Sequence, residues 1–261
     1  MNDQLSKRMK EQYEMRTRSY LPRRTYTIIR LDGRAFHTFT KNMQRPYDEH
    51  FMNAMDETTK YLCENIQGCK FGYVQSDEIS LLLTDFETIT TDAWFDGQVQ
   101  KIVSIAAALA TGKFNQLMMT NGINNDIKIE EIISIILNKD LAQFDARVFT
   151  IADPTEVENY FIWRQKDAVR NSLQMHAQSL YSHKELNGKS QVEQHDMIHA
   201  KGENWDKLPD GFKRGRNITK YRIYDVETID NLIDHGTTWK INPAYDYLKE
   251  RDELTNLIPK L

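Results

Sequence analysis

The stretch Tyr26-Thr27-Ile28-Ile29-Arg30-Leu31-Asp32-Gly33 decides the interpretation of the fold. It is short, rich in β-branched and apolar residues, and ends in Asp-Gly. This pattern is typical of a strand that is followed by a tight turn. We therefore predict a first strand that delivers an acidic residue to one end of a sheet.

The segments downstream supply the rest of a sheet. Two short strands, 70–74 and 79–84, are joined by the hairpin tip Gln75-Ser76-Asp77-Glu78. Helices are predicted at 48–66 and 96–111, and an alternating strand at 144–151. The order strand, helix, strand, strand, helix, strand is the split βαβ, ferredoxin-like pattern of an α+β fold.

The remaining segments are predicted to be mainly helical, with a helix-rich C-terminal half. We expect helices at 3–18, 153–181, 190–202 and 246–258, a helical insertion at 119–142, and a strand at 216–225. No internal repeat is visible. We divide the chain into a catalytic region at 1–140, a region at 141–225 that completes the sheet, and a tail at 226–261.

Composition limits the class of protein. The chain has 261 residues, 40% of them hydrophobic and 28% charged, and a net charge of −4. These values are typical of a globular protein with a substantial core, and they argue against a non-specific coat on nucleic acid. We see no stretch near the roughly 20 apolar residues of a membrane helix, and no signal peptide. We expect a cytoplasmic protein without a membrane partner, with Cys63 and Cys69 as buried thiols.

Two acidic tips are the strongest candidates for chemistry. In a split βαβ sheet the first and third strands are neighbours, so Asp32 and the pair Asp77-Glu78 come together at one edge. Close carboxylates repel, and a divalent cation such as Mg²⁺ removes that conflict. Gly33 allows a tight turn whose carbonyl could also face a metal. Two ions here would activate a hydroxyl and stabilise a leaving pyrophosphate, although Asp-Gly and Ser-Asp-Glu are also ordinary turn sequences.

Groups suited to phosphate binding surround these acids. Arg34-Ala35-Phe36-His37 follows Asp32 directly, where backbone N–H groups can hold a triphosphate. Arg45 could add a positive charge and Ser76 a hydroxyl. We interpret the Phe36 side chain as a core residue and His37 as a hydrogen-bonded loop histidine.

Three blocks together resemble the tRNA-His guanylyltransferase superfamily. They are Arg30–His37, Gln75–Ser80 and Tyr160-Phe161-Ile162-Trp163-Arg164-Gln165-Lys166-Asp167, and the resemblance extends over about 6–225. It implies a palm similar to that of DNA polymerases, which extends RNA at the 5′ end. A 5′-monophosphate on tRNA is activated with ATP or GTP, and the 3′-hydroxyl of an incoming NTP then attacks that end.

The resemblance also implies roles for individual residues. The metal ligands of the family fall on Asp32, the Gly33 carbonyl and Asp77, around two Mg²⁺ ions. Nucleotide-binding positions fall on Asp32 through His37 and on Ser76-Asp77. Glu78 matches a position linked to activity, so Asp32, Asp77 and Glu78 are the predicted catalytic residues. The resemblance further implies a homotetramer, a dimer of dimers.

One block departs from the pattern of members that act on histidine tRNA. Those members carry His-Ile-Asn-x-Leu-Tyr-Asn where this chain has Val169-Arg170-Asn171-Ser172-Leu173-Gln174-Met175. The His and Tyr are absent here, while Asn171 and Leu173 match. The departure favours the guanylyltransferase-like branch, which prefers template-directed repair of 5′-truncated tRNAs. We hypothesise that Watson–Crick pairing selects the added nucleotide.

Basic residues are predicted to contact tRNA. The run Lys213-Arg214-Gly215-Arg216 can bind phosphates, which position RNA without reading its sequence. A short cluster of charges is also an ordinary solvated surface. The full predicted set is Arg164, Arg170, Asn171, Lys189, Lys213, Arg214 and Arg216.

Other interpretations stay open. His195 and His199 have the i, i+4 spacing of a zinc pair, but Asp196 is a poor general base and no third ligand is evident. A palm-type nucleotide cyclase would use the same two acids without RNA. A tRNA-binding module without catalysis is a third alternative, which the intact acids disfavour.

Overall fold

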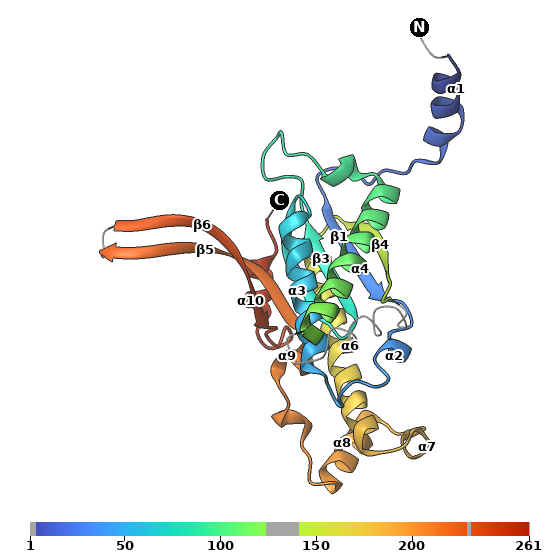
Figure 1. The fold of residues 1–261 in the computed structure, drawn as a ribbon. Helices are drawn as coiled ribbons and strands as arrows, with labels where there is room; N and C mark the ends of the chain where they lie inside the picture. The colour runs from blue at the N-terminus through green and yellow to red at the C-terminus, as the bar shows by residue number, and fades with distance from the viewer. Residues whose placement is uncertain (1–3, 124–140, 229–230, 261) are drawn as a thin grey trace.

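A computed structural model describes residues 4–123, 141–228 and 231–260. The strands in these ranges form a 6-stranded sheet with the order β4-β1-β3-β2-β5-β6 (Figure 1). The strands are β1 (Tyr26–Gly33), β2 (Cys69–Gln75), β3 (Glu78–Leu83), β4 (Phe144–Ile151), β5 (Arg216–Thr228) and β6 (Asn231–Pro243). All neighbouring pairs are antiparallel.

The first four strands confirm the predicted topology. β1 lies between β4 and β3, and Asp32 is opposite Glu78 in the register. Since β2 and β3 form a hairpin beside β1, the partial order β4-β1-β3-β2 is that of a split βαβ unit. The predicted α+β class is therefore confirmed.

Two helices cover one face of the sheet. α3 (Glu49–Asn65) begins where the Asp48 carboxylate accepts a hydrogen bond from the Phe51 amide at 2.9 Å, an N-cap. α4 (Val99–Ile123) packs beside it, and between the helices and the sheet lies a core that includes Leu31, Leu81 and Phe114. α2 (Phe36–Phe39) and the 3₁₀ turn η2 (Trp94–Gly97) border this layer.

The opposite face is covered by α6 (Pro154–Leu180) and α10 (Arg251–Leu257). α6 begins as predicted, because Asp153 caps it and Pro154 takes the first helical position. Its far half packs against four short elements: α7 (His183–Leu186), α8 (Gln191–Ala200), η3 (Trp205–Lys207) and α9 (Asp210–Arg214).

α4 is long and strongly apolar. By length and composition alone, Val99–Thr120 could cross a membrane. In this fold Ile102, Ala106, Ala110 and Phe114 are buried against the sheet. The small residues allow this face of the helix to approach the sheet closely.

The tail differs most from the prediction. β5 continues past residue 225 and pairs with β6, which was not predicted, and the two strands project from the body as an arm (Figure 1). The final helix begins at Arg251, because backbone bonds from Lys249 and Glu250 to Asp246 form a turn first. The first helix is α1 (Gln4–Gln12), followed by a separate 3₁₀ turn, η1 (Glu14–Thr17). Most of the predicted insertion at 119–142 lies outside the described residues, and α4 includes its start.

Candidate active site

The two acidic turns meet at one end of the sheet. The Gly33 amide donates a hydrogen bond to the Asp77 carbonyl oxygen at 3.1 Å. Asp32 and Glu78 face each other across β1 and β3. The predicted approach of the two acidic tips is therefore confirmed, and strand pairing sets it.

The electrostatics of Asp77 suit a cation. Burial raises the pKa of the Asp77 carboxyl, and the charge of Asp32 raises it further, while a hydrogen bond with Ser76 opposes the rise. The Asp32 carboxylate lies 3.7 Å from Nη2 of Arg147, which is too far for a hydrogen bond. A divalent cation between the two carboxylates would relieve their repulsion and favour both charged forms.

The donor set fits Mg²⁺. Two carboxylates and a backbone carbonyl are hard oxygen ligands, and Mg²⁺ ordinarily keeps water or substrate phosphates in its other positions. Among the described residues, no three or more His, Cys, Asp or Glu side chains group in a way that could hold a metal. A cation at Asp32 and Asp77 would therefore depend on substrate or water for much of its coordination.

Glu78 has a different environment from the other two acids. Its Oε2 accepts hydrogen bonds from Arg30 Nη2 at 2.6 Å and from Arg164 Nη1 at 2.7 Å. Arg164 also pairs with Asp167 on α6. Burial raises the pKa of Glu78, although the two guanidiniums oppose that rise. Glu78 thus links the β2–β3 turn to β1 and α6 through its Oε2, which accepts both of these hydrogen bonds.

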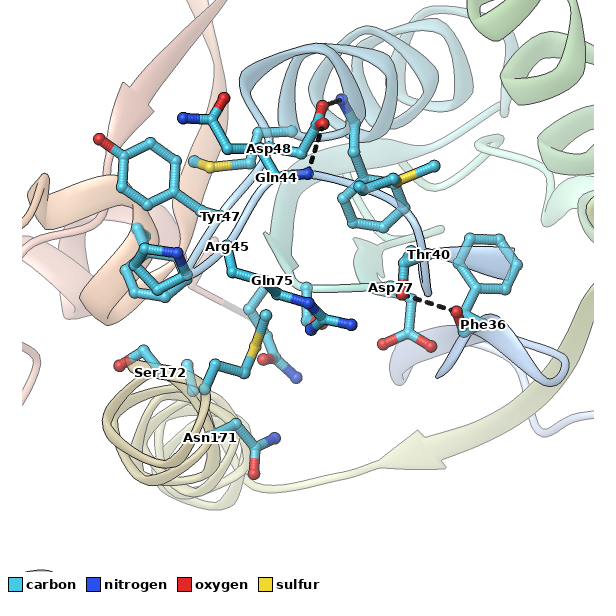
Figure 2. Close-up of a pocket in the computed structure, with 18 of the residues that line it drawn as sticks. Phe36, Thr40, Gln44, Arg45, Tyr47, Asp48, Gln75, Asp77, Asn171 and Ser172 are labelled. Carbon is cyan, nitrogen blue, oxygen red and sulfur yellow. Dashed lines mark hydrogen bonds between the residues drawn. The ribbon is translucent and has the colours of Figure 1, made fainter. Parts of the chain in front are cut away.

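A cavity of about 340 Å³ opens beside Asp77. Its walls come from four parts of the chain: the segment 36–52, the β2–β3 turn, the second half of α6, and Phe212 and Arg216. Figure 2 shows Arg45 reaching across the cavity toward Asp77, with Asn171 on the opposite wall. Polar lining groups include Gln75, Ser76, Asn171, Ser172 and Gln178, and apolar ones include Met43, Tyr47, Met52, Met175 and Phe212.

The residues after Asp32 face two different parts of the structure: Arg34 faces the start of β4, and Phe36 and His37 line the cavity. The Arg34 amide and side chain both bond to Gln143, each at 2.8 Å, which turns Arg34 toward the start of β4. Ala35 has a left-handed backbone with φ of 55°. Phe36 is buried in the core, and His37 contacts the Thr38 hydroxyl at 3.1 Å, as predicted for both.

Three of the predicted tRNA contacts need correction. Arg164 is buried and pairs with Glu78, and Arg216 is buried against Asp56 with Nε–Oδ1 of 2.6 Å. Lys213 is buried as well, and its Nζ donates to the Asp206 carbonyl at 2.6 Å. Burying a charge is costly unless it is paired, so these three cations serve first as partners of buried acceptors, although Arg216 also lines the cavity.

The other predicted contacts remain accessible. Arg170 has 56% of its side chain exposed and pairs with Asp167, while Lys189 pairs with Glu193 at the surface. Arg214 is partly exposed and bonds to Asp210. Asn171 lines the cavity.

Comparison with known proteins assigns the family. A family model described as tRNAHis guanylyltransferase (Thg1) matches residues 6–152, more than half of the chain. The chain belongs to this family. The guanylyltransferases are nucleotidyltransferases, and this protein is an enzyme of that class.

The relatives of this guanylyltransferase-family chain extend over nearly its whole length. A structure titled bacterial tRNA(His) guanylyltransferase (Thg1)-like protein in complex with ATP has a TM-score of 0.81 and 37% identity, covering 97% of this chain and 99% of that one. A second, titled as the complex with GTP, has a TM-score of 0.74 and 35% identity over 98% and 99%. An uncharacterized protein of Acanthamoeba polyphaga mimivirus is 31% identical over 89% of this chain and 82% of its own.

Several residues that line the cavity were not singled out from the sequence. Tyr47 and Phe212 line the cavity but belong to no motif, since the fold alone brings them together, and Gln75 lines it although no role was predicted for that residue within its block. Arg30 had a usable signal: it is a charged residue in an otherwise apolar strand. Such a residue needs a buried partner, and Glu78 is that partner.

Proposed function

We propose that this chain is a 3′–5′ nucleotidyltransferase that adds nucleotides to the 5′ end of tRNA. The observation that carries the proposal is the paired Asp32 and Asp77 beside a cavity with both apolar and amide-bearing walls. Such a cavity suits a nucleobase, while the acids and Arg45 suit its triphosphate. The similar bacterial structures titled with ATP and with GTP support this assignment.

Two displacements at phosphorus make up the proposed reaction. First, the 5′-monophosphate oxygen of tRNA attacks the α-phosphorus of ATP or GTP, and pyrophosphate leaves. The 3′-hydroxyl of the incoming NTP then attacks the activated 5′-phosphorus, loses its proton, and expels the nucleoside monophosphate. Positioning and charge stabilisation provide most of the catalysis in such transfers.

Residues of this chain have distinct parts in that reaction. Asp32, Asp77 and the Gly33 carbonyl would hold two Mg²⁺ ions, which stabilise the negative charge that develops on the phosphates. The Gly33–Asp77 hydrogen bond keeps the two carboxylates in place. Arg45 and Ser76 bind phosphate oxygens, and Asn171 faces the nucleotide from α6.

We further propose template-directed repair of 5′-truncated tRNA. Met175 lines the cavity at a position where members specific for histidine tRNA carry asparagine, whereas Asn171 matches their block. Without that block, pairing with the opposite strand is the simplest source of nucleotide choice. We also expect a homotetramer, which sedimentation of the purified protein tests.

One incubation tests the function. A 5′-monophosphorylated, 5′-truncated tRNA is supplied with ATP, Mg²⁺ and one NTP at a time, on templates that differ in the opposing base. We expect extension only by the complementary nucleotide, and none when Asp77 is replaced by asparagine. Guanylate addition to every template contradicts repair. A cyclic product from GTP without RNA, with no extension of tRNA, contradicts the proposed function in favour of a cyclase.

A further inference from the structure

Trp163 is an aromatic side chain that the proposed reaction does not yet use. It lies on α6 within the Trp-Arg-Gln block, and 50% of its surface is exposed. The Arg164 guanidinium carbon lies 3.6 Å from the centre of its ring, and that of Arg30 lies 5.9 Å away. Two guanidinium groups thus lie close to this large ring, while half of the side chain remains open to solvent.

The indole is held on a rigid base. Arg164 is 2% exposed, and Glu78 and Asp167 fix its guanidinium. Tyr160, one helical turn earlier, packs edge-on against Trp163 with 6.0 Å between ring centres. A fixed, half-exposed aromatic ring supported by arginine is well suited to stack on a nucleobase, because little side-chain entropy remains to be lost.

The surroundings of Trp163 lead directly to the acids. Arg30 is opposite Arg147 in the β1–β4 register, and Arg147 has 54% of its side chain exposed. The Arg147 Nη2 lies 3.7 Å from Asp32. A strip of aromatic and cationic groups therefore extends from Trp163 to the predicted metal site, with Trp163 and Arg147 exposed and Arg30 largely buried.

This strip is distinct from the nucleotide cavity. The α6 residues that line the cavity lie between Ala168 and Gln178, at least one turn beyond Trp163. The cavity and the strip thus approach Asp32 and Asp77 from different parts of the surface. A reaction that joins an NTP to an RNA end needs two such approaches.

We propose that Trp163 is the stacking platform for the terminal base pair of the tRNA acceptor stem, and that Arg147 contacts the adjoining phosphates. This inference rests on the proposed function, since it assumes that the second substrate is an RNA end. Protein recognition of RNA commonly uses terminal or unpaired bases stacked on aromatic rings and phosphates paired with arginine.

The test uses Trp163→Ala and Trp163→Phe in the full-length protein. The control is Phe95→Ala, because Phe95 is also exposed and has Lys101 over its ring at 5.8 Å, but belongs to η2, whose Gly97 bonds to Leu21 before the start of β1, at the end away from Asp32. The first probe is a 5′-monophosphorylated tRNA, whose dissociation constant is measured. The second is the same tRNA with 2-aminopurine at its 5′-terminal nucleotide, whose emission is read at saturating protein.

We expect Trp163→Ala to weaken tRNA binding about tenfold, as loss of one stacked base does, and to abolish the quenching of 2-aminopurine. Trp163→Phe should retain most of the tRNA affinity and most of the quenching. Phe95→Ala should retain all of the affinity and all of the quenching. ATP binding of Trp163→Ala should match the wild type, and thermal unfolding of Trp163→Phe should do so as well. Unchanged tRNA affinity and quenching in Trp163→Ala would overturn the inference, as would a change in sedimentation that places Trp163 in a subunit contact. Failure of the wild type itself to bind and extend tRNA would instead reject the proposed function.

Discussion

The amide of Gly33 donates a hydrogen bond to the carbonyl oxygen of Asp77, with 3.1 Å between the two atoms. This bond closes the end of the β1–β3 ladder, in which Asp32 pairs with Glu78. The separation of the two predicted metal ligands is therefore set by backbone contacts and does not depend on a bound cation. The free protein already carries the electrostatic cost of holding the two carboxylates together.

Asp77→Asn should remove part of that cost and stabilise the free protein at neutral pH. The pKa of Asp77 is raised in the folded state, so the folded chain binds this proton more tightly than the unfolded chain. Its destabilising effect is absent below the ordinary carboxyl pKa and grows as pH rises through the folded-state pKa. We expect a higher unfolding temperature than wild type at pH 7.5, with the difference shrinking toward pH 4.

The same substitution should lower extension activity about 100-fold or more, because a metal ligand contributes several kcal/mol to phosphoryl transfer. Asp92→Asn is the control, since Asp92 is exposed and distant from the acids. If the Asp77→Asn protein were less stable than wild type at neutral pH, the inference that the Asp77 charge destabilises the free protein would be wrong.

Glu78→Gln should lower stability and activity together. Glu78 is the buried acceptor for Arg30 and Arg164, and breaking a buried ion pair costs about 3–5 kcal/mol. Loss of the charge also releases the β2–β3 turn that carries Asp77. Glu57→Gln, on the exposed side of α3, should change neither property. Thermal unfolding and extension assays measure the effects, and lost activity at unchanged stability would show that Glu78 acts directly on substrate.

The elements that the sequence predicted well are those with local signals. β1 alternates between the two faces of the sheet, α3 and α6 begin at capping residues, and the β2–β3 hairpin has an obvious polar tip. Pairing of these elements follows from the split βαβ order. The two acidic tips could therefore be placed together before their contacts were known.

The parts that were missed depend on long-range contacts. β6 contains Asp234, Gly236 and Asn242, which weaken any strand pattern, and it forms through pairing with β5. The environments of Arg164 and Arg216 depend on Glu78 and Asp56, which are far away in the sequence. A basic residue that binds a buried carboxylate cannot be told from one that binds RNA by its type alone.

Gly33→Ala should disturb the active site through Phe36. A Cβ at position 33 would lie 2.4 Å from Cδ2 of the Phe36 ring, which is itself buried among other aromatic rings. Overpacking of this kind costs about 1–3 kcal/mol. We expect a lower unfolding temperature and reduced extension. Adding Phe36→Leu to this variant should restore part of the activity, and no recovery would argue against the steric cause.

Arg45→Ala should weaken binding of ATP about tenfold, because Arg45 extends into the cavity near Asp77 and its charge-assisted hydrogen bonds to phosphate would be lost. Lys41→Ala provides the control, as Lys41 is exposed and four residues earlier. The measurement is a titration with a fluorescent ATP analogue. Equal affinity of the two variants would place the triphosphate elsewhere.

Arg170→Ala and Arg216→Ala should affect tRNA binding in different ways. Arg170 is exposed on α6, so losing one phosphate contact should reduce the slope of log affinity against log salt by about one, with little change in stability. Arg216 is buried against Asp56, so its loss should lower the unfolding temperature by several degrees and leave the slope unchanged. Binding curves at four salt concentrations, together with thermal unfolding, separate the two effects. If Arg216→Ala alone reduced the slope, the division between buried structural cations and exposed RNA contacts would be wrong.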